Sequence, residues 1–144
     1  MKPSPELILN QAFAKIAMEM GPALPPGYGQ GSATTTAVLL LMVAQEFNRA
    51  AFIRKTENDA MRLLFRETAA NTGGALGEKL KAAGDGDDSD ITVAALDTSN
   101  ASLKTLLIEL QTVAENRNDK VLEARIIRMM QGWAAARLVF LPAM

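Results

Sequence analysis

Arginine side chains are the groups in this sequence best suited to recognising a small ligand. Arg49, Arg62 and Arg66 belong to a concentration of positive charge on the predicted middle helices. Arg125 belongs to the last predicted helix. Guanidinium groups bind carboxylates and phosphates through paired hydrogen bonds, so these arginines are candidates for holding an anionic ligand. We prefer the alternative that nearby carboxylates, such as Glu67, pair with them on ordinary solvated helix faces.

Two aromatic residues are further candidates for ligand contact. The segment Pro25-Pro26-Gly27-Tyr28 matches the P-P-x-Y pattern that WW domains bind. We expect these prolines to stiffen a loop and Tyr28 to lie over the edge of the core. Trp133 and the eight methionines are suited to lining a pocket for an apolar ligand between helices. Core filling is the preferred interpretation of Trp133, because methionine and tryptophan commonly fill helical cores.

The carboxylates do not form a complete metal-binding pattern. Asp85 and Asp87 occupy the first and third positions of a possible calcium loop, but Asp90 stands at the sixth position, where glycine is required. Glu115 and Asp119 are four residues apart, and a predicted turn falls between them. We therefore expect a solvated acidic linker, with no metal and no cofactor.

Composition removes several classes of function. The chain has no cysteine and no histidine, which excludes disulfides, thiolate nucleophiles, imidazole bases and the usual zinc sites. Fifteen basic and sixteen acidic residues leave a net charge of -1, so no bulk field attracts nucleic acid or anionic lipid. The longest apolar run, residues 37–44, is far shorter than the roughly 20 residues that span a bilayer. With no signal-peptide pattern, we expect a cytoplasmic protein that binds neither nucleic acid nor membrane.

Caps and apolar spacing predict the helices that position these groups. Ser4, followed by a proline and an acidic residue, predicts an N-cap for a first helix of about sixteen residues. Gly21-Pro22 should end that helix, because proline cannot donate to it. The prolines and glycines of residues 21–31 predict a loop, and Ser32 then caps a second helix.

The second helix is predicted to break. An unbroken helix from Ser32 to Ala70 would be about 58 Å long, whereas a compact chain of this size has a radius of gyration of only about 14 to 15 Å. We therefore predict a break near Lys55 to Asn58, within a run of polar residues. The competing prediction is a long helix that extends into a partner subunit.

The rest of the chain also predicts helices. Gly73-Gly74 marks a turn before a short helix that ends at Gly84. The segment Ile91–Leu96 fits either a short helix or an extended connector. A clear helix runs from Ser99 to a turn at residues 116–118.

The last helix, about Asp119 to Leu141, carries an apolar seam at alternating steps of four and three residues. The seam consists of Leu122, Ile126, Met129, Trp133, Ala136 and Phe140. Because the preceding turn is short, the last two helices should form an antiparallel hairpin. The sequence therefore predicts a single all-α domain, residues 1–144, built as an antiparallel helical bundle of four main helices plus short helices.

The order of the first two helices resembles that of small all-α bacterial domains of unknown function. The first helix ends in Gly21-Pro22-Ala23-Leu24, and the apolar helix ends near Gln45-Glu46-Phe47. This resemblance covers about a quarter of the chain and implies no particular activity.

These observations favour a non-catalytic helical interaction or adaptor protein that self-associates. A long apolar middle helix and a positive mean hydropathy, +0.07, offer more apolar surface than a four-helix monomer hides easily. We expect a homodimer, with Val121 and Ile127 as examples of interface positions, and a further protein partner that the sequence does not identify. The alternative is a protein that binds a small anionic or apolar ligand, or a carboxylate- or divalent-metal-dependent enzyme.

Overall fold

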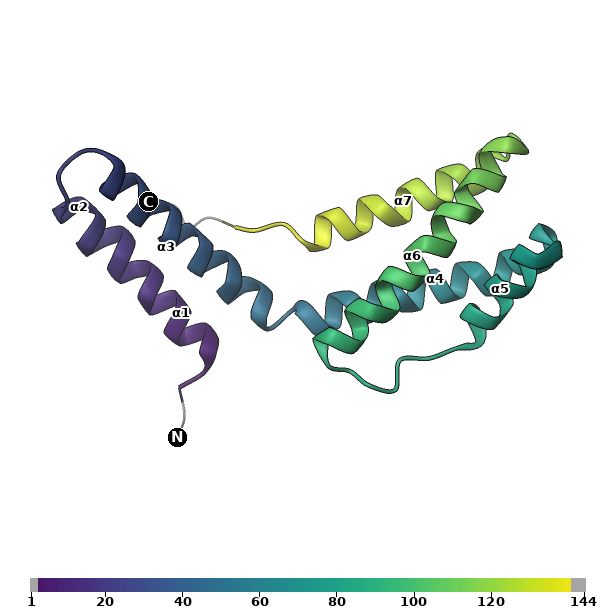
Figure 1. The fold of residues 1–144 in the computed structure, drawn as a ribbon, viewed down its shortest axis with the longest axis horizontal. Coiled ribbons are helices and arrows are strands. Elements are labelled where there is room, and N and C mark those ends of the chain that lie inside the picture. Colours follow the sequence, from purple (N-terminus) through teal and green to yellow (C-terminus); the bar gives the residue numbers. More distant parts are fainter. Residues whose placement is uncertain (1–2, 141–144) are drawn as a thin grey trace. The chain divides into compact units, whose positions relative to one another are not determined.

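The computed structural model describes residues 3–140, and these residues form helices joined by short segments without any strand (Figure 1). The all-α prediction is therefore confirmed. By its contacts the chain divides into two compact units. Unit 1 comprises Met1–Ala50 with Val139–Met144, and unit 2 comprises Ala51–Leu138. The single-domain organisation stays a prediction.

Unit 1 begins with the predicted cap. Ser4 precedes α1 (Pro5–Ala14), and its Oγ accepts a hydrogen bond from the Leu7 N–H at 3.2 Å. The helix continues as the π-helical segment η1 (Lys15–Met20) and the short α2 (Gly21–Ala23). The predicted stop at Gly21 is therefore wrong by three residues. The Gly21 N–H bonds to the Ile16 carbonyl in the π-helical register, and Pro22 is tolerated because it lies in the first turn of α2.

The second helix, α3 (Tyr28–Phe47), begins four residues before the predicted cap at Ser32. Gly27 is its N-cap, with φ 144°, a conformation that favours glycine. The Gly31 N–H already bonds to the Gly27 carbonyl at 3.2 Å, so the predicted loop shortens to a few residues around the prolines. Tyr28 is 94% exposed, which shows that its expected position over the core edge is wrong.

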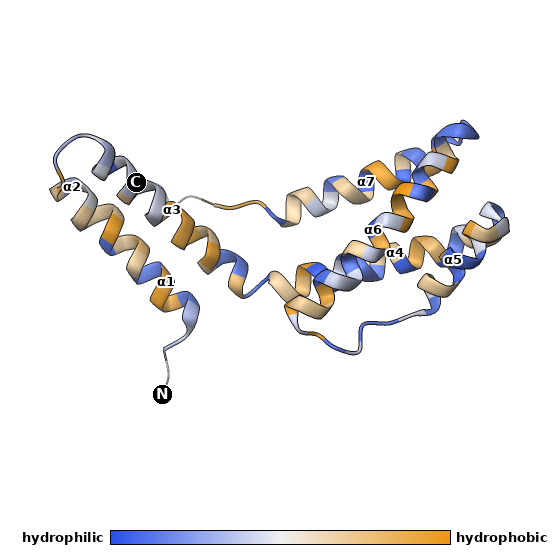
Figure 2. Cartoon of the chain, in the orientation of Figure 1, coloured by the Kyte–Doolittle hydropathy of each residue, from blue (hydrophilic) through white to orange (hydrophobic). Residues whose placement is uncertain are grey.

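Packing in unit 1 depends on one face of α3 (Figure 2). Ala37, Leu41 and Ala44 are buried at steps of four and three residues, and α1 lies along α3. The side chain of Gln45 pairs with the backbone of Phe140: its Oε1 accepts from the Phe140 N–H at 3.0 Å, and its Nε2 donates to the Phe140 carbonyl at 2.6 Å. This pairing ties residues near the C-terminus to unit 1.

The middle helix breaks at residues 48–49, between α3 and α4 (Ala50–Thr72). The Arg49 N–H bonds to the Glu46 carbonyl at 3.0 Å in this turn. The predicted break at Lys55 to Asn58 is wrong, since α4 runs through these residues without interruption. The polar run does not end the helix because two of its members are buried and hydrogen-bonded inside unit 2.

Unit 2 contains α4 from Ala51 onward, α5 (Gly74–Asp85), α6 (Val93–Asn116) and α7 (Lys120–Ala136). The predicted turn at Gly73-Gly74 is confirmed, and both glycines have a positive φ, 67° and 60°. Beyond it, α5 lies close to α4. A Cβ added at Gly77 would lie 2.7 Å from the Ala69 carbonyl oxygen, so this contact requires glycine.

Helix α6 begins earlier than the sequence indicated. Thr92 is its N-cap, and the Thr92 Oγ1 accepts from the Ala95 N–H at 3.4 Å. Residues 93–96 of the ambiguous segment Ile91–Leu96 therefore begin a long helix, while Ile91 precedes its cap. Asp119, where the last helix was predicted to start, is the N-cap of α7, with its carboxylate accepting from the Leu122 N–H at 3.0 Å.

Helix α7 ends at Ala136, so Phe140 lies outside the helix and does not continue the predicted seam; Leu141 lies outside the described residues. The seam nevertheless holds from Leu122 to Trp133. The buried core of unit 2 draws on α4, α5, α6 and α7. It consists of Met61, Leu64, Phe65, Ala69, Leu80, Leu103, Leu107, Leu110 and Ile126, with Trp133 and Met129 packed against it.

Candidate functional site

The most unusual feature of unit 2 is a cluster of polar side chains on the buried face of α4. Glu57 is 1% exposed, Asn58 0% and Arg62 8%. These residues share the helix face that carries Met61 and Phe65 into the core. Burying such groups is costly unless each is hydrogen-bonded, so their partners decide what the cluster does.

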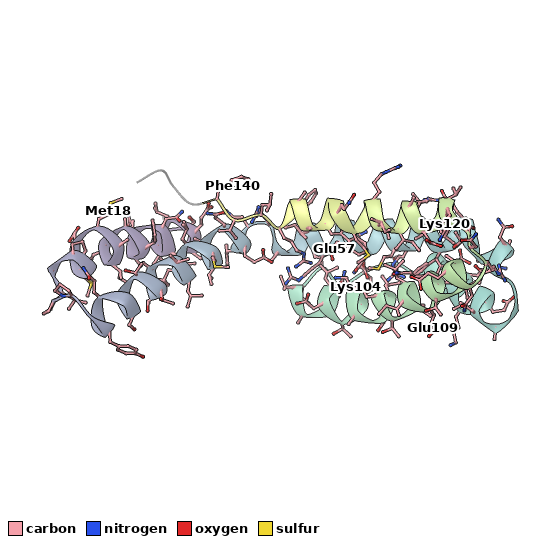
Figure 3. The ribbon with its side chains drawn as sticks, turned by 90° about the horizontal axis from the view of Figure 1, so that it is seen from above. Met18, Glu57, Lys104, Glu109, Lys120 and Phe140 are labelled. Carbon is pink, nitrogen blue, oxygen red and sulfur yellow. The ribbon has the colours of Figure 1, made fainter. Side chains whose placement is uncertain are left out.

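Glu57 has a complete set of partners. Its Oε1 accepts from Arg137 Nε at 2.8 Å and from the terminal Arg137 Nη2 at 2.7 Å. Its Oε2 accepts from Lys104 Nζ and from Asn100 Nδ2, both at 3.1 Å. Figure 3 labels Glu57 on α4 and Lys104 on α6, which meet between the two helices. The carboxylate therefore joins α4 to α6 and to the residue that follows α7.

Two buried asparagines extend the cluster toward the acidic segment. Asn100 Nδ2 also donates to Asn58 Oδ1 at 2.9 Å. Asn58 Nδ2 donates to Asp88 Oδ2 at 3.0 Å and to the Leu96 carbonyl at 3.3 Å. The hydrogen bonds from Glu57 thus continue without interruption to Asp88.

Arg62 and Asp88 form a buried ion pair at the far end of the cluster. Arg62 Nη2 lies 3.0 Å from Asp88 Oδ1, and the two side chains are only 10% and 3% exposed. Ser99 Oγ donates to the same carboxylate oxygen at 2.6 Å. Arg62 Nη1 donates to the Ala83 carbonyl at 2.6 Å, while Arg62 Nε has no partner among the described residues. The expectation of a solvated acidic linker is therefore wrong for Asp88.

The electrostatics of the cluster keep both carboxylates ionised. Burial alone would raise the pKa of Glu57, but hydrogen bonds from Arg137, Lys104 and Asn100 outweigh burial and lower that pKa. Burial likewise opposes ionisation of Asp88, and its bonds to Ser99, Asn58 and Arg62 lower its pKa overall. On the surface, hydrogen bonds from the Thr92 backbone and side chain lower the pKa of Asp90.

This arrangement is suited to holding helices together. The described partners occupy both oxygens of Glu57 and both oxygens of Asp88. No group of three or more His, Cys, Asp or Glu side chains within residues 3–140 is placed to hold a metal ion. We name this set the polar clamp: Glu57, Asn58, Arg62, Asp88, Ser99, Asn100, Lys104 and Arg137. It fastens the segment before α6 and the end of α7 onto α4.

Two hollows on the surface of unit 2 differ in the charges of the side chains that line them. A hollow of 470 Å³ between α4 and α5 is lined by Arg66 and Lys81, but also by Glu78 and Asp85. Arg66 Nη1 donates to the Gly84 carbonyl, so this guanidinium already has an internal partner. A hollow of 400 Å³ beside the polar clamp is lined by aspartates and hydroxyl groups from residues 87–102.

The residues that the sequence offered as ligand-binding candidates do not share one site within either unit. In unit 1, Tyr28 is exposed, and Arg49 Nε donates to the Gln45 carbonyl at 3.0 Å. In unit 2, Arg62 belongs to the polar clamp, which contradicts its assignment to a solvated helix face.

The remaining candidates in unit 2 also have structural partners. Arg125 forms an ion pair with Glu67 on the surface. Trp133 is half-buried against the core, and Lys104 Nζ lies 5.4 Å from the centre of its ring. A cation over an aromatic ring at this distance adds a modest attraction. Trp133 therefore helps to place Lys104 beside Glu57.

Sequence reasoning missed Glu57, Asn58 and Asn100, although a signal for them was present. Glu57 stands four residues before Met61 and therefore lies on the same helix face. Asn100 stands between Leu96 and Leu103 in the buried stripe of α6. A polar residue inside an apolar stripe at helical spacing indicates a buried, hydrogen-bonded group.

A second feature is an exposed apolar face on α3 in unit 1. Leu39, Met42, Val43 and Phe47 are 55%, 42%, 52% and 51% exposed. At about 100° per residue, Leu39, Val43 and Phe47 lie on the side of the helix away from buried Leu41, and Met42 lies on the flank between them and Leu41. Every residue from 37 to 44 is apolar, so this stretch of α3 has no polar side (Figure 2). We name these four residues the outer stripe.

The comparisons with known proteins give no assignment, since no protein-family model, curated protein or solved structure matches the chain. Among residues 3–140, no single helix is long and apolar enough to cross a membrane, and only α3 taken together with α4 across their break reaches that length and composition.

Proposed function

We propose that this chain is a non-catalytic helical interaction protein that self-associates as a homodimer through the outer stripe of α3. One observation carries the proposal: the stretch of α3 at residues 37–44, which is apolar on all sides, packs only one of its sides within unit 1. Helices that are apolar all round belong in interiors. A second copy of the same face supplies the missing cover, because dimers with twofold symmetry bring identical surfaces together.

The free energy gained by covering the outer stripe is comparable with the cost of association. Burying one Val, Leu, Phe or Met side chain completely stabilises by about 1.5 to 3 kcal/mol. The four residues of the outer stripe are about half exposed, so covering the rest contributes roughly 1 kcal/mol each, or about 8 kcal/mol for two copies. Association costs of the order of 4 to 15 kcal/mol in lost freedom. We therefore expect a dimer whose population depends on protein concentration.

The polar clamp supports a non-catalytic assignment. A catalytic carboxylate or lysine needs an open coordination position or a free face toward substrate. Both oxygens of Glu57 accept hydrogen bonds, and Lys104 is engaged with Glu57 and lies over the Trp133 ring. These groups stabilise unit 2 and leave the recognition role to exposed apolar surfaces.

The test is the mass of the chain in solution, measured by native mass spectrometry and light scattering. The protein concentration is varied from about 1 to about 200 μM, the order of magnitude expected for the dissociation constant of a weak dimer. The parent chain should change from monomer to dimer with concentration. Val43→Lys should weaken the dimer at least tenfold, because a charged side chain would enter the contact. Thr34→Lys is the matched control on the same helix, since Thr34 is exposed and lies away from the outer stripe.

Two other results would contradict the proposal. A parent chain that stays monomeric over the whole range would remove self-association. The alternative location for the dimer contact is the set of exposed apolar residues on α7, where Val121 is 82% and Ile127 51% exposed. Loss of the dimer in Ile127→Lys, together with an unchanged dimer in Val43→Lys, would place the contact on α7 instead.

A further inference from the structure

We infer that the hollow between α4 and α5 binds a small zwitterion, a molecule that carries one carboxylate and one ammonium group, as a free α-amino acid does. The site belongs to unit 2 and does not depend on the proposed self-association. The hollow has a volume of 470 Å³, which is typical of small-molecule sites. Its lining combines small residues, among them Ala69 and Gly77, with four charged residues: Arg66, Glu78, Lys81 and Asp85.

Two close approaches of α5 to α4 fix the backbone around the hollow. A Cβ added at Gly77 would lie 2.7 Å from the Ala69 carbonyl oxygen, and a Cβ added at Gly84 would lie 3.0 Å from the Arg66 backbone nitrogen. The two glycines are seven residues apart, which is about two helical turns. Because the helices meet at both points, the hollow is formed before a ligand arrives, and binding does not have to order the backbone.

The guanidinium group of Arg66 is anchored beside the hollow. Its Nη1 donates to the Gly84 carbonyl, which holds the group in one orientation. A guanidinium has five N–H donors, so donors remain for a ligand. Lys81 adds a second cation from α5. An anchored guanidinium is suited to a carboxylate, because it binds this group through paired hydrogen bonds.

The charged residues around the hollow do not neutralise one another. Glu78, Lys81 and Asp85 follow at steps of three and four residues, so they lie on one face of α5. Within residues 3–140, none of these three side chains makes a hydrogen bond or an ion pair, and Arg66 pairs with no carboxylate. Two cations and two anions therefore line one hollow and keep their charges available to a ligand.

This mixture of charges favours a ligand that carries both signs. The two basic residues would attract a simple anion, but Glu78 and Asp85 would repel it, and a simple cation would meet the reverse. A zwitterion gives each charge a partner when its carboxylate lies toward Arg66 and Lys81 and its ammonium group toward the acids. The four side chains are exposed, so water weakens each pair, and we expect a dissociation constant on the order of 1 mM.

The experiment titrates the full-length chain with L-leucine and follows the backbone amide signals by NMR. The small residues of the lining leave room for an uncharged side chain, which is why L-leucine is the probe. Two analogues each lack one charge: isocaproate has no ammonium group, and isopentylamine has no carboxylate. L-leucine should shift the amide signals of Gly73 and Gly77, and each analogue should bind at least roughly tenfold more weakly, because it loses one set of charge pairs.

Variants that remove one charge locate the site. Lys81→Gln and Glu78→Gln, both at exposed positions, should each weaken L-leucine binding several-fold. Glu78→Gln should at the same time strengthen isocaproate binding, because a repelling carboxylate is gone, and a merely structural change would not do so. Arg128→Gln, at an exposed position on α7, is the control and should change nothing. The inference is overturned if about 20 mM L-leucine shifts neither glycine amide, if all three compounds bind equally, or if the control variant weakens binding as much as the others.

Discussion

Replacing Arg62 with methionine tests the account of the polar clamp most directly. Methionine keeps an unbranched side chain of similar length and removes the charge and the donors. Asp88, with a side chain only 3% exposed, would lose its ion-pair partner, and the Ala83 carbonyl would lose its 2.6 Å donor. Ser99 and Asn58 would remain bonded to the carboxylate. The variant therefore leaves a buried charge that is hydrogen-bonded but not neutralised.

The magnitude follows from that burial. Removing one partner of a buried ion pair costs about 3 to 5 kcal/mol, because the remaining charge is uncompensated. Unit 2 spans residues 51–138, and for a domain of about 60 to 100 residues 1 kcal/mol shifts the melting temperature by roughly 4 to 8 °C. Arg62→Met should therefore lower the melting temperature by at least about 12 °C. An exposed arginine gives the matched control, Arg128→Met, for which we expect almost no change.

Urea unfolding followed by circular dichroism, at pH 7 and at pH 4, gives a second readout. If the loss comes from the uncompensated Asp88 carboxylate, the penalty should shrink at pH 4, where protonation relieves it. Adding Asp88→Asn to Arg62→Met should likewise recover part of the stability at pH 7. A loss no greater than that of Arg128→Met, or a penalty independent of both pH and Asp88→Asn, would refute the reasoning.

Two further predictions concern the parent chain and one close helix contact. The free energy of unfolding should fall as the pH drops below about 4.5. Folding lowers the pKa of Glu57 and Asp88 from their ordinary values of 4.5 and 3.8, so the unfolded chain binds more protons than the folded chain. A urea midpoint that stays the same between about pH 5 and about pH 3, a range that brackets those pKa values, would contradict this prediction. Gly77→Ala should destabilise by about 1 to 3 kcal/mol, because its Cβ would lie 2.7 Å from the Ala69 carbonyl oxygen. Gly132→Ala, where nothing lies within 4 Å, should stabilise slightly, and equal melting temperatures for the two variants would count against the close contact.

The sequence predicted those helix starts and turns that depend on interactions between neighbouring residues. Ser4 caps the first helix through a hydrogen bond from a residue three positions later, as predicted, and the last helix starts beside Asp119 as predicted. The turn at Gly73-Gly74 follows from the backbone freedom of glycine. Each of these features depends on a few neighbouring residues, so the pattern alone is sufficient. The predicted N-cap at Ser32 was wrong because Gly27, which has no hydroxyl group, caps α3 earlier in the chain.

The break in the middle helix was misplaced for a different reason. The polar run at Lys55 to Asn58 is typical of a solvated interruption when only neighbouring residues are considered. Inside unit 2, however, Glu57 meets Lys104 and Arg137, which are 47 and 80 residues away in sequence. Tertiary partners therefore turn a polar segment into buried helix, and no local pattern contains that information. The same holds for Asp88, which looked like one aspartate of an exposed acidic linker.

The two units differ in how far they cover their own apolar groups, and this difference supports the proposal that recognition occurs in unit 1. In unit 2 nearly every buried polar atom has a partner from the same unit, and the apolar side chains of four helices share one core. In unit 1 the described helices are essentially two antiparallel partners, and α3 buries only Ala37, Leu41 and Ala44. Short helices gain most of their stability from packing an apolar face. Because Leu39, Met42 and Val43 on the other side of α3 are also apolar, we propose that covering them would stabilise unit 1 and form the interface at the same time.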